Sequence, residues 1–328
     1  MDMQIGSDLC FPHLFNTSCK KPTSSWTESV LFHTILSIIS LLTVALNLLV
    51  IISISHFRKL HTTTNILLLS LAVSDFLVGL LLMPREIMRN TACWLYGDLI
   101  CSLYNYVCYI ITSASVGDMV LISVDRYLAI CDPLHYPFIV TVRRVKVCVC
   151  LCWLGSVLYN SVIVNTDFTQ AGQHNSCYGE CVIVVDYIVG TFDLIITFFT
   201  PLTVIIVLYI RVFMVAVSQA RAMRSHITVI TLQHSMTLTR KSELKAARTL
   251  GVLIIVFLIC FCPYYCVILA GNDLLTDPYA SNVIFLFYFN SSLNPVIYAL
   301  FYPWFRRAIK LIITFQILEP GSCEASIQ

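Results

Sequence analysis

Seven long apolar runs limit what this chain can fold into more than any other feature of its sequence. They cover Val30–Ile54, Asn65–Met83, Ser102–Val124, Val145–Val164, Val182–Ile210, Leu250–Ala270 and Ser281–Phe301. An α-helix needs about 20 apolar residues to cross the hydrocarbon core of a bilayer. The runs are about twice too long for barrel strands and lack their alternating pattern. We therefore expect an all-α membrane protein, with a seven-transmembrane helix bundle at residues 30–303 after a tail at residues 1–29.

The composition agrees with lipid as the solvent for most of the chain. Of its 328 residues, 58% are hydrophobic and 12% are charged, and the net charge is +2. Soluble domains carry roughly 25% charged residues, so this composition excludes a cytosolic enzyme and a disordered protein. A nucleic-acid partner is excluded too, because its binding requires a large basic excess. No metal-ligand cluster, nucleophile elbow or phosphate loop stands out, so we expect no enzymatic activity.

The basic residues predict the orientation in the membrane. Of the 20 Lys and Arg residues, all but Lys20, Lys21, Arg85 and Arg89 fall in one set of connecting segments. The positive-inside rule then places the N-terminus outside the cell and the C-terminus in the cytoplasm. Asn16 begins a glycosylation sequon on the tail that is expected to be outside. We expect a multi-pass protein of the plasma membrane.

Six of the 15 cysteines lie in the segments expected outside or at helix mouths. They are Cys10, Cys19, Cys93, Cys101, Cys177 and Cys181. The extracellular side is oxidising, so these cysteines are expected to form disulfides, and their spacing alone leaves the pairing open.

Polar residues within the runs carry the functional information, because each is costly in lipid unless it is paired or hydrated. The set comprises Asn47, Asp75, Asp118, Asp193, Asn290 and Asn294. Asp118, midway along the third run, either hydrogen-bonds to Trp153 or is protonated, and the sequence gives it no functional role.

Each run also carries a landmark, and together these landmarks resemble the rhodopsin-like G-protein-coupled receptors over about residues 28–317. The landmarks are Asn47, Leu71 with Asp75, Cys101, Asp125-Arg126-Tyr127, Trp153, Pro201, Pro263 and Asn294-Pro295-Val296-Ile297-Tyr298. The stretch from Asn290 to Phe305 resembles the trace amine-associated receptors, and so does the segment from Cys177 to Cys181. The resemblance implies a small-molecule amine as ligand, an olfactory role, and a heterotrimeric G protein of the stimulatory type that raises cAMP.

The sequence departs from the aminergic pattern at three positions. Cys108 stands where aminergic receptors carry an Asp in the third helix, and Asp193 stands in the fifth helix at a position usually small or hydroxylated. Phe261 replaces the Trp usual in the sixth helix.

These departures make Asp193 the expected anchor of a ligand ammonium. We expect a cavity lined by Asp193, Cys108, Tyr104, Tyr109, Thr112, Thr197, Phe261, Tyr264, Tyr265, Ile284 and Tyr288. Aromatic rings stabilise an ammonium through cation–π contacts, and no neighbouring run offers a Lys or Arg to Asp193. The alternative is a protonated or water-bonded structural Asp beside a Tyr stripe that belongs to the core.

The resemblance implies two further sites. A sodium ion, acting as an allosteric modulator with no other cofactor, is expected at Asp75, Ser115, Asn290, Ser291 and Asn294. The G-protein coupling face and its switch are expected at Asp125, Arg126, Tyr127, Tyr209, Glu243 and Tyr298. An amphipathic segment, Trp304–Ile317, is expected to lie along the inner leaflet of the bilayer, within a tail at residues 304–328 whose Cys323 is a candidate for palmitoylation.

The resemblance also implies that Cys101 pairs with Cys181. Cys177 then takes Cys10 or Cys19 as its partner, and the remaining cysteine reaches Cys93. Of these two arrangements we expect Cys10–Cys177 with Cys19–Cys93.

Two other functions compete with the amine receptor. A serotonin- or histamine-type neurotransmitter receptor is disfavoured by the Asn290–Phe305 stretch. A secondary transporter of organic cations usually shows internal repeats, and none is visible between the halves of this chain. The Ser281–Phe301 run contains no Lys, which excludes a covalently bound retinal.

Overall fold

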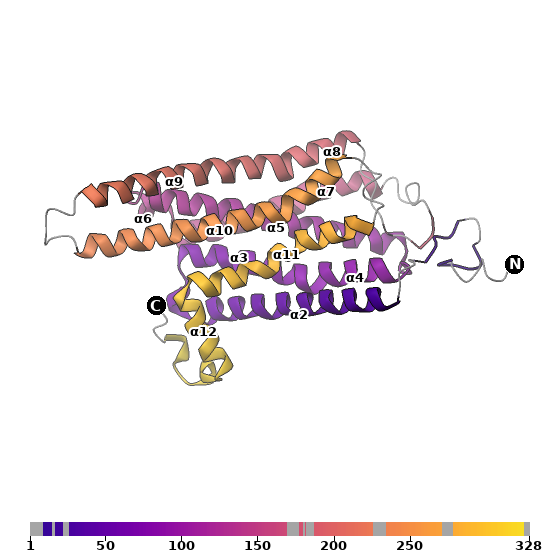
Figure 1. The fold of residues 1–328 in the computed structure, drawn as a ribbon, viewed down its shortest axis with the longest axis horizontal. Coiled ribbons are helices and arrows are strands. Elements are labelled where there is room, and N and C mark those ends of the chain that lie inside the picture. The colour runs from indigo at the N-terminus through magenta and orange to yellow at the C-terminus, as the bar shows by residue number, and fades with distance from the viewer. Residues whose placement is uncertain are drawn as a thin grey trace.

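The computed structural model describes residues 9–14, 17–21, 26–168, 177–179, 181, 187–225, 234–270 and 278–324. The described chain is all-helical and contains seven helices long and apolar enough to cross a membrane. These helices run side by side as one bundle, and the cysteine-rich N-terminal segment and α12 lie at its opposite ends (Figure 1).

The spans are built from the following elements. The first is α2 (Trp26–His56), the third α5 (Gly97–Cys131), the fourth α7 (Val142–Phe168), the sixth α10 (His234–Ala270) and the seventh α11 (Pro278–Phe301). The second joins α3 (Thr63–Leu77), η3 (Val78–Leu82) and α4 (Met83–Thr91), and the fifth joins α8 (Tyr187–Leu194), η4 (Ile195–Phe199) and α9 (Thr200–Ser225). Short helices η2 (Arg58–Leu60) and α6 (Tyr136–Ile139) lie in the connections.

Two spans contain a widened π-helical turn, and each turn comes just before a proline. The η3 turn precedes Pro84, and the η4 turn precedes Pro201. Proline has no amide N–H and cannot continue the regular hydrogen-bond ladder, so a local change of helical pitch accommodates it. The second helix therefore continues past Met83, where the apolar run ends, and its span extends to Met88.

The main core runs through the middle of the bundle. It includes Leu71 of α3, Met119 of α5, Ile205 of α9, Phe257 of α10 and Tyr298 of α11, all almost fully buried. By contrast, α7 presents an apolar outer face, with Leu151, Leu154 and Leu158 exposed. Exposed leucines on a spanning helix are expected where lipid is the neighbour.

The amphipathic segment is shorter than the sequence predicts. Helix α12 (Pro303–Ile313) leaves the end of α11 and turns across the bundle (Figure 1), and it stops four residues before Ile317. Phe315 then adopts a positive φ of 57°, which a regular helix does not allow, and the chain continues into η6 (Gln316–Leu318) and η7 (Ser322–Glu324). Here the prediction of a continuous segment to Ile317 is wrong.

Three disulfides tie the other end of the bundle together. They join Cys101 to Cys181, Cys10 to Cys93, and Cys19 to Cys177. The first is the pairing that the resemblance implies. The predicted pairs Cys10–Cys177 and Cys19–Cys93 are wrong, because an antiparallel bridge between Leu9 and Lys20 and a parallel bridge between Ser18 and Tyr178 bring Cys19, rather than Cys10, beside Cys177.

Candidate functional site

Asp193 occupies a polar position between the fourth and fifth spans. The Tyr159 hydroxyl, from α7, donates a hydrogen bond to Asp193 Oδ1 at 2.9 Å. The Thr197 hydroxyl donates to the Asp193 backbone carbonyl at 2.7 Å across the widened η4 turn. Asp193 is half-buried, and it forms no ion pair within the part of the chain that the structure describes. Tyr159 was not among the predicted site residues, although a Tyr in an apolar helix usually needs a partner for its hydroxyl.

Aromatic residues predicted to line the cavity continue from Asp193 across the sixth and seventh spans. Tyr265 interacts with both Asp193 and Thr197 and stacks on Phe198, with ring centroids 3.9 Å apart. Tyr264 lies 4.9 Å from Phe287, and Phe287 lies 4.2 Å from Phe261, centroid to centroid. The carboxylate is thus connected to a continuous group of rings that includes three of the predicted lining residues.

A second group of predicted lining residues lies between the second, third and seventh spans. Cys108 interacts with Tyr104, and Cys108 and Tyr288 both pack against the apolar cluster around Leu82 and Ile111. Tyr109, Thr112 and Ile284 are half-buried, and their place in the cavity stays a prediction.

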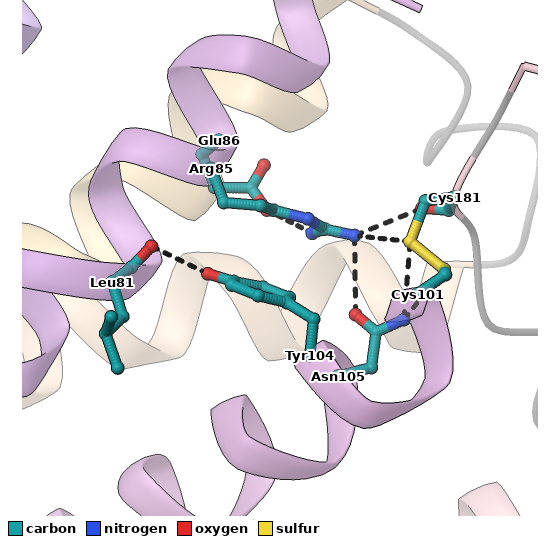
Figure 2. Close-up of polar contacts among 7 residues, drawn as sticks. All are labelled: Leu81, Arg85, Glu86, Cys101, Tyr104, Asn105 and Cys181. Atoms are coloured by element: carbon teal, nitrogen blue, oxygen red, sulfur yellow. Dashed lines mark hydrogen bonds and ion pairs between the residues drawn. A yellow bond between two sulfur atoms is a disulfide. The ribbon is translucent and has the colours of Figure 1, made fainter. Parts of the chain in front are cut away.

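Arg85 and Glu86 accompany this second group, and the sequence did not place them in the bundle. Their side chains form an ion pair of 2.6 Å and are only 13% and 3% exposed. Figure 2 shows the Arg85 guanidinium reaching from the second span toward the Cys101–Cys181 disulfide, above the Tyr104 ring. Pro84 is the sequence feature that could have located them. A proline is tolerated in the first turn of a helix, so the second span can continue past Pro84 to Arg85 and Glu86.

Two of the residues predicted to bind sodium, Asn294 and Ser291, interact with the fully buried Asp75 carboxylate. Asn294 Nδ2 donates to Asp75 Oδ2 at 2.8 Å, and Ser291 also interacts with this carboxylate. Asp75 Oδ1, Asn290 Oδ1 and Asn294 Oδ1 are buried and have no hydrogen-bond partner among the described residues. Ser115 is buried too. Carboxylate and amide oxygens without donors are ligands that a hard cation prefers, so this donor set fits a sodium ion.

Asp118 is also fully buried, but both of its carboxylate oxygens accept hydrogen bonds from a neutral donor. The Ser70 hydroxyl contacts both carboxylate oxygens, at 2.9 and 2.8 Å, and Trp153 Nε1 donates to Ser70 Oγ at 3.0 Å. Trp153 therefore reaches Asp118 through Ser70 rather than directly. This network connects the second, third and fourth spans.

Arg126 and its neighbours form a compact network at the end of the third span. Arg126 pairs with Asp125 at 2.5 Å and also contacts the Thr64 hydroxyl. Thr64 and Tyr136 donate to the two Asp125 oxygens, at 3.0 and 2.8 Å. All described donors to Asp125 thus come from the second span, the third span and α6.

The remaining switch residues lie around this network. Tyr127 packs against Ile130 and Val212, and the Tyr209 ring fills the space that a side chain at Gly251 would need. Tyr298 is fully buried. The side chain of Glu243 and the sequon residue Asn16 lie outside the described residues, so the roles assigned to them stay predictions.

Seven spans, a disulfide at one end and an Asp-Arg-Tyr network at the other define a multi-pass membrane receptor rather than an enzyme. The chain matches the family described as 7 transmembrane receptor (rhodopsin family) over residues 46–298, and it belongs to that family. It is therefore a G-protein-coupled receptor.

The chain is also similar, over nearly its full length, to individual receptors of one named group. The chain is 36% identical to trace amine-associated receptor 13c of Danio rerio, over 98% of this chain and 96% of the relative. It is 37% identical to trace amine-associated receptor 8a of Rattus norvegicus, over 99% and 97% of the two chains. Identity to trace amine-associated receptor 1 of Mus musculus is 33%, over 95% and 97%.

Proposed function

We propose that this receptor is of the trace amine type and binds an amine whose ammonium group pairs with Asp193. The observation that carries the proposal is the position of Asp193, half-buried, held by Tyr159 and adjoining the rings around Tyr265. Among the described residues this carboxylate has no cationic partner, and a ligand ammonium would supply one. Its relatives' names, trace amine-associated receptors, support the same ligand class.

Signalling follows from the family and from the Arg126 network. In this proposal the disulfide end faces the outside of the cell and the Arg126 end faces the cytoplasm, where a stimulatory G protein docks and raises cAMP. An olfactory role belongs to the same proposal. The separate sites at Asp193 and Arg126 give the receptor a ligand end and a transducer end.

Sodium is proposed as the resident modulator at Asp75. Asp75, Asn290, Asn294 and Ser291 would hold it, and its charge would neutralise the buried carboxylate. The Asn294 amide donates to Asp75 Oδ2 and so orients the carboxylate. Asp75 Oδ1 has no donor among the described residues and would be the oxygen that faces the ion.

The test is the dose–response of Asp193→Asn in cells carrying a cAMP reporter, screened with volatile mono- and diamines. Asn keeps the shape of Asp and removes its charge, and deleting one partner of a desolvated charge pair costs about 2–5 kcal/mol. The agonist EC50 should rise at least about tenfold at equal surface expression. Cys108→Ala, which alters the cavity lining without removing a charge, should change the EC50 much less than Asp193→Asn does. An unchanged dose–response in Asp193→Asn would overturn the proposal.

A further inference from the structure

The surroundings of Arg85 resemble a binding site for an organic cation. The guanidinium contacts the Glu86 carboxylate at 2.6 Å through Nη1 and lies 5.0 Å from the centroid of the Tyr104 ring. Its Nη2 also donates to the Asn105 side-chain oxygen at 3.3 Å and to the Cys181 carbonyl at 3.1 Å. A carboxylate, an aromatic face and neutral oxygens are the groups that recognise an ammonium or guanidinium.

The groups around the guanidinium are themselves held in place. The Tyr104 hydroxyl donates to the Leu81 carbonyl at 2.8 Å, which fixes its ring beneath Arg85 (Figure 2). Asn105 Nδ2 contacts the Cys101 and Cys181 sulfurs at 3.4 and 3.7 Å, which leaves its oxygen directed at Arg85. The receiving site is therefore built by the second span, the third span and the Cys101–Cys181 disulfide, and its Tyr104 ring and Asn105 amide are held by contacts that do not involve Arg85.

This site borders the cavity of the proposed function. Cys108 hydrogen-bonds to Tyr104, whose ring lies under Arg85. Cys108 and Tyr288, from the third and seventh spans, both pack against the apolar cluster around Leu82 of the second span, and Glu86 lies within electrostatic range of both. A cation bound at Glu86 would thus lie between the second and third spans near Tyr104, whereas Asp193 contacts Tyr159 of the fourth span.

We propose that Arg85 is a built-in cation that occupies a second amine-recognition site, formed by Glu86, Tyr104, Asn105 and the Cys181 carbonyl. Because the protein fills this site itself, the ligand brings a single ammonium group, which Asp193 takes. The inference rests on the proposed function and narrows its ligand class to monoamines. Removing Arg85 should convert the receptor into one that favours diamines.

The experiment compares three variants with the wild type. Arg85→Ala removes the cation and leaves space, Arg85→Met removes the cation but keeps the space filled, and the double variant Arg85→Ala with Glu86→Gln removes the carboxylate as well. Each is tested with a series of linear α,ω-diamines of increasing length and with monoamines of matched length. The readouts are the cAMP dose–response and the amount of receptor at the cell surface.

For a diamine of at least one length, the ratio of its EC50 to that of the matched monoamine should be at least tenfold lower in Arg85→Ala than in the wild type. That gain should be absent from Arg85→Met and from the double variant. Removing Arg85 takes a charge partner from the buried Glu86 carboxylate, which is costly, so Arg85→Ala is expected at the surface in reduced amount. Diamine added during expression should then raise its surface level at least twofold, whereas the monoamine should not.

Two results would overturn the inference: a wild-type receptor as sensitive to diamines as to matched monoamines, or an Arg85→Ala variant in which no diamine improves the response or the surface level. Failure of the proposed function looks different, because it is a wild-type receptor that is unaffected by Asp193→Asn. The surface-level readout needs no signalling, so it tests the Glu86 site even then.

Discussion

The two ends of the bundle are held together by different kinds of bonds. At the disulfide end, three disulfides join the N-terminal segment to Cys93 and Cys177 and the third span to Cys181. Arg85 of the second span, paired with Glu86, also donates to Asn105 of the third span and to the Cys181 carbonyl. Toward the Arg126 end, the buried acids Asp75 and Asp118 are held by neutral hydrogen-bond donors, and Asp125 holds Arg126 with help from Thr64 and Tyr136.

This difference makes the contacts at the disulfide end permanent and allows the contacts at the Arg126 end to exchange partners. A disulfide breaks only by a redox reaction, whereas hydrogen bonds and a single ion pair can exchange partners during a conformational change. A receptor needs a stable frame around its ligand and movable contacts where the transducer binds. The following predictions test whether the two ends behave in this way.

The largest effect is expected from removing the Cys101–Cys181 disulfide with the double variant Cys101→Ser and Cys181→Ser. Loss of a native disulfide typically costs about 2–5 kcal/mol, and here it also frees the carbonyl that holds Arg85. The agonist response should be lost, as measured by the cAMP reporter together with surface labelling. Cys266→Ser, at an exposed free cysteine, is the control and should behave as wild type. A normal response in the double variant would show that this end is not a rigid frame.

The next effect is the sodium dependence of agonist affinity. If sodium occupies the Asp75 site in the inactive state, ion and agonist favour opposite states and must weaken each other's binding reciprocally. Replacing sodium with a bulky organic cation at constant ionic strength should raise agonist affinity about fivefold in wild-type membranes.

The control for sodium is Asp75→Asn, in which the affinity difference should disappear. A wild type without sodium dependence would instead indicate a protonated, structural Asp75.

A smaller effect is expected from Asp125→Asn. The change removes the charge that pairs with Arg126, so the inactive arrangement loses stability relative to the active one. Agonist-independent cAMP, normalised to surface receptor, should rise about threefold. Asp132→Asn is the control, because the Asp132 side chain is 45% exposed and pairs with the exposed His135. Unchanged basal signalling would mean that the Asp125–Arg126 pair does not hold the receptor inactive.

The smallest effect is expected from Asp118→Asn. The amide keeps an acceptor for Ser70, and the Asp118 side chain is fully buried. The agonist EC50 should change less than about twofold, in contrast to Asp193→Asn. A loss as large as that of Asp193→Asn would place Asp118 in the signalling path.

Hydropathy was sufficient to predict the seven spans, because each run is long enough to cross lipid and the backbone must satisfy its own hydrogen bonds there. The position of side chains around each helix was harder to predict. A widened turn changes which residues share a face, and the η4 turn begins at Ile195, two residues after Asp193. The contact with Tyr159 depends on how the fourth and fifth spans pack, which no local pattern contains.

The same limit explains the missed charges and the wrong disulfides. Arg85 and Glu86 follow a proline at the end of the apolar run, so the run alone could not show that the helix continues. Cysteine spacing does not encode pairing. The bridges of the N-terminal segment, which select Cys19 for Cys177, form between residues far apart in the sequence.

The three disulfides together have a topological consequence, because they link three short stretches of chain into one closed covalent loop. The loop passes from Cys10 to Cys19, crosses to Cys177, continues to Cys181, crosses to Cys101, returns to Cys93, and crosses back to Cys10. A protease that cuts once within any of these stretches opens the loop without releasing a fragment, and a reductant that opens one disulfide leaves every segment attached. The N-terminal segment from Cys10 to Cys19 therefore stays covalently attached to the bundle after a single cut.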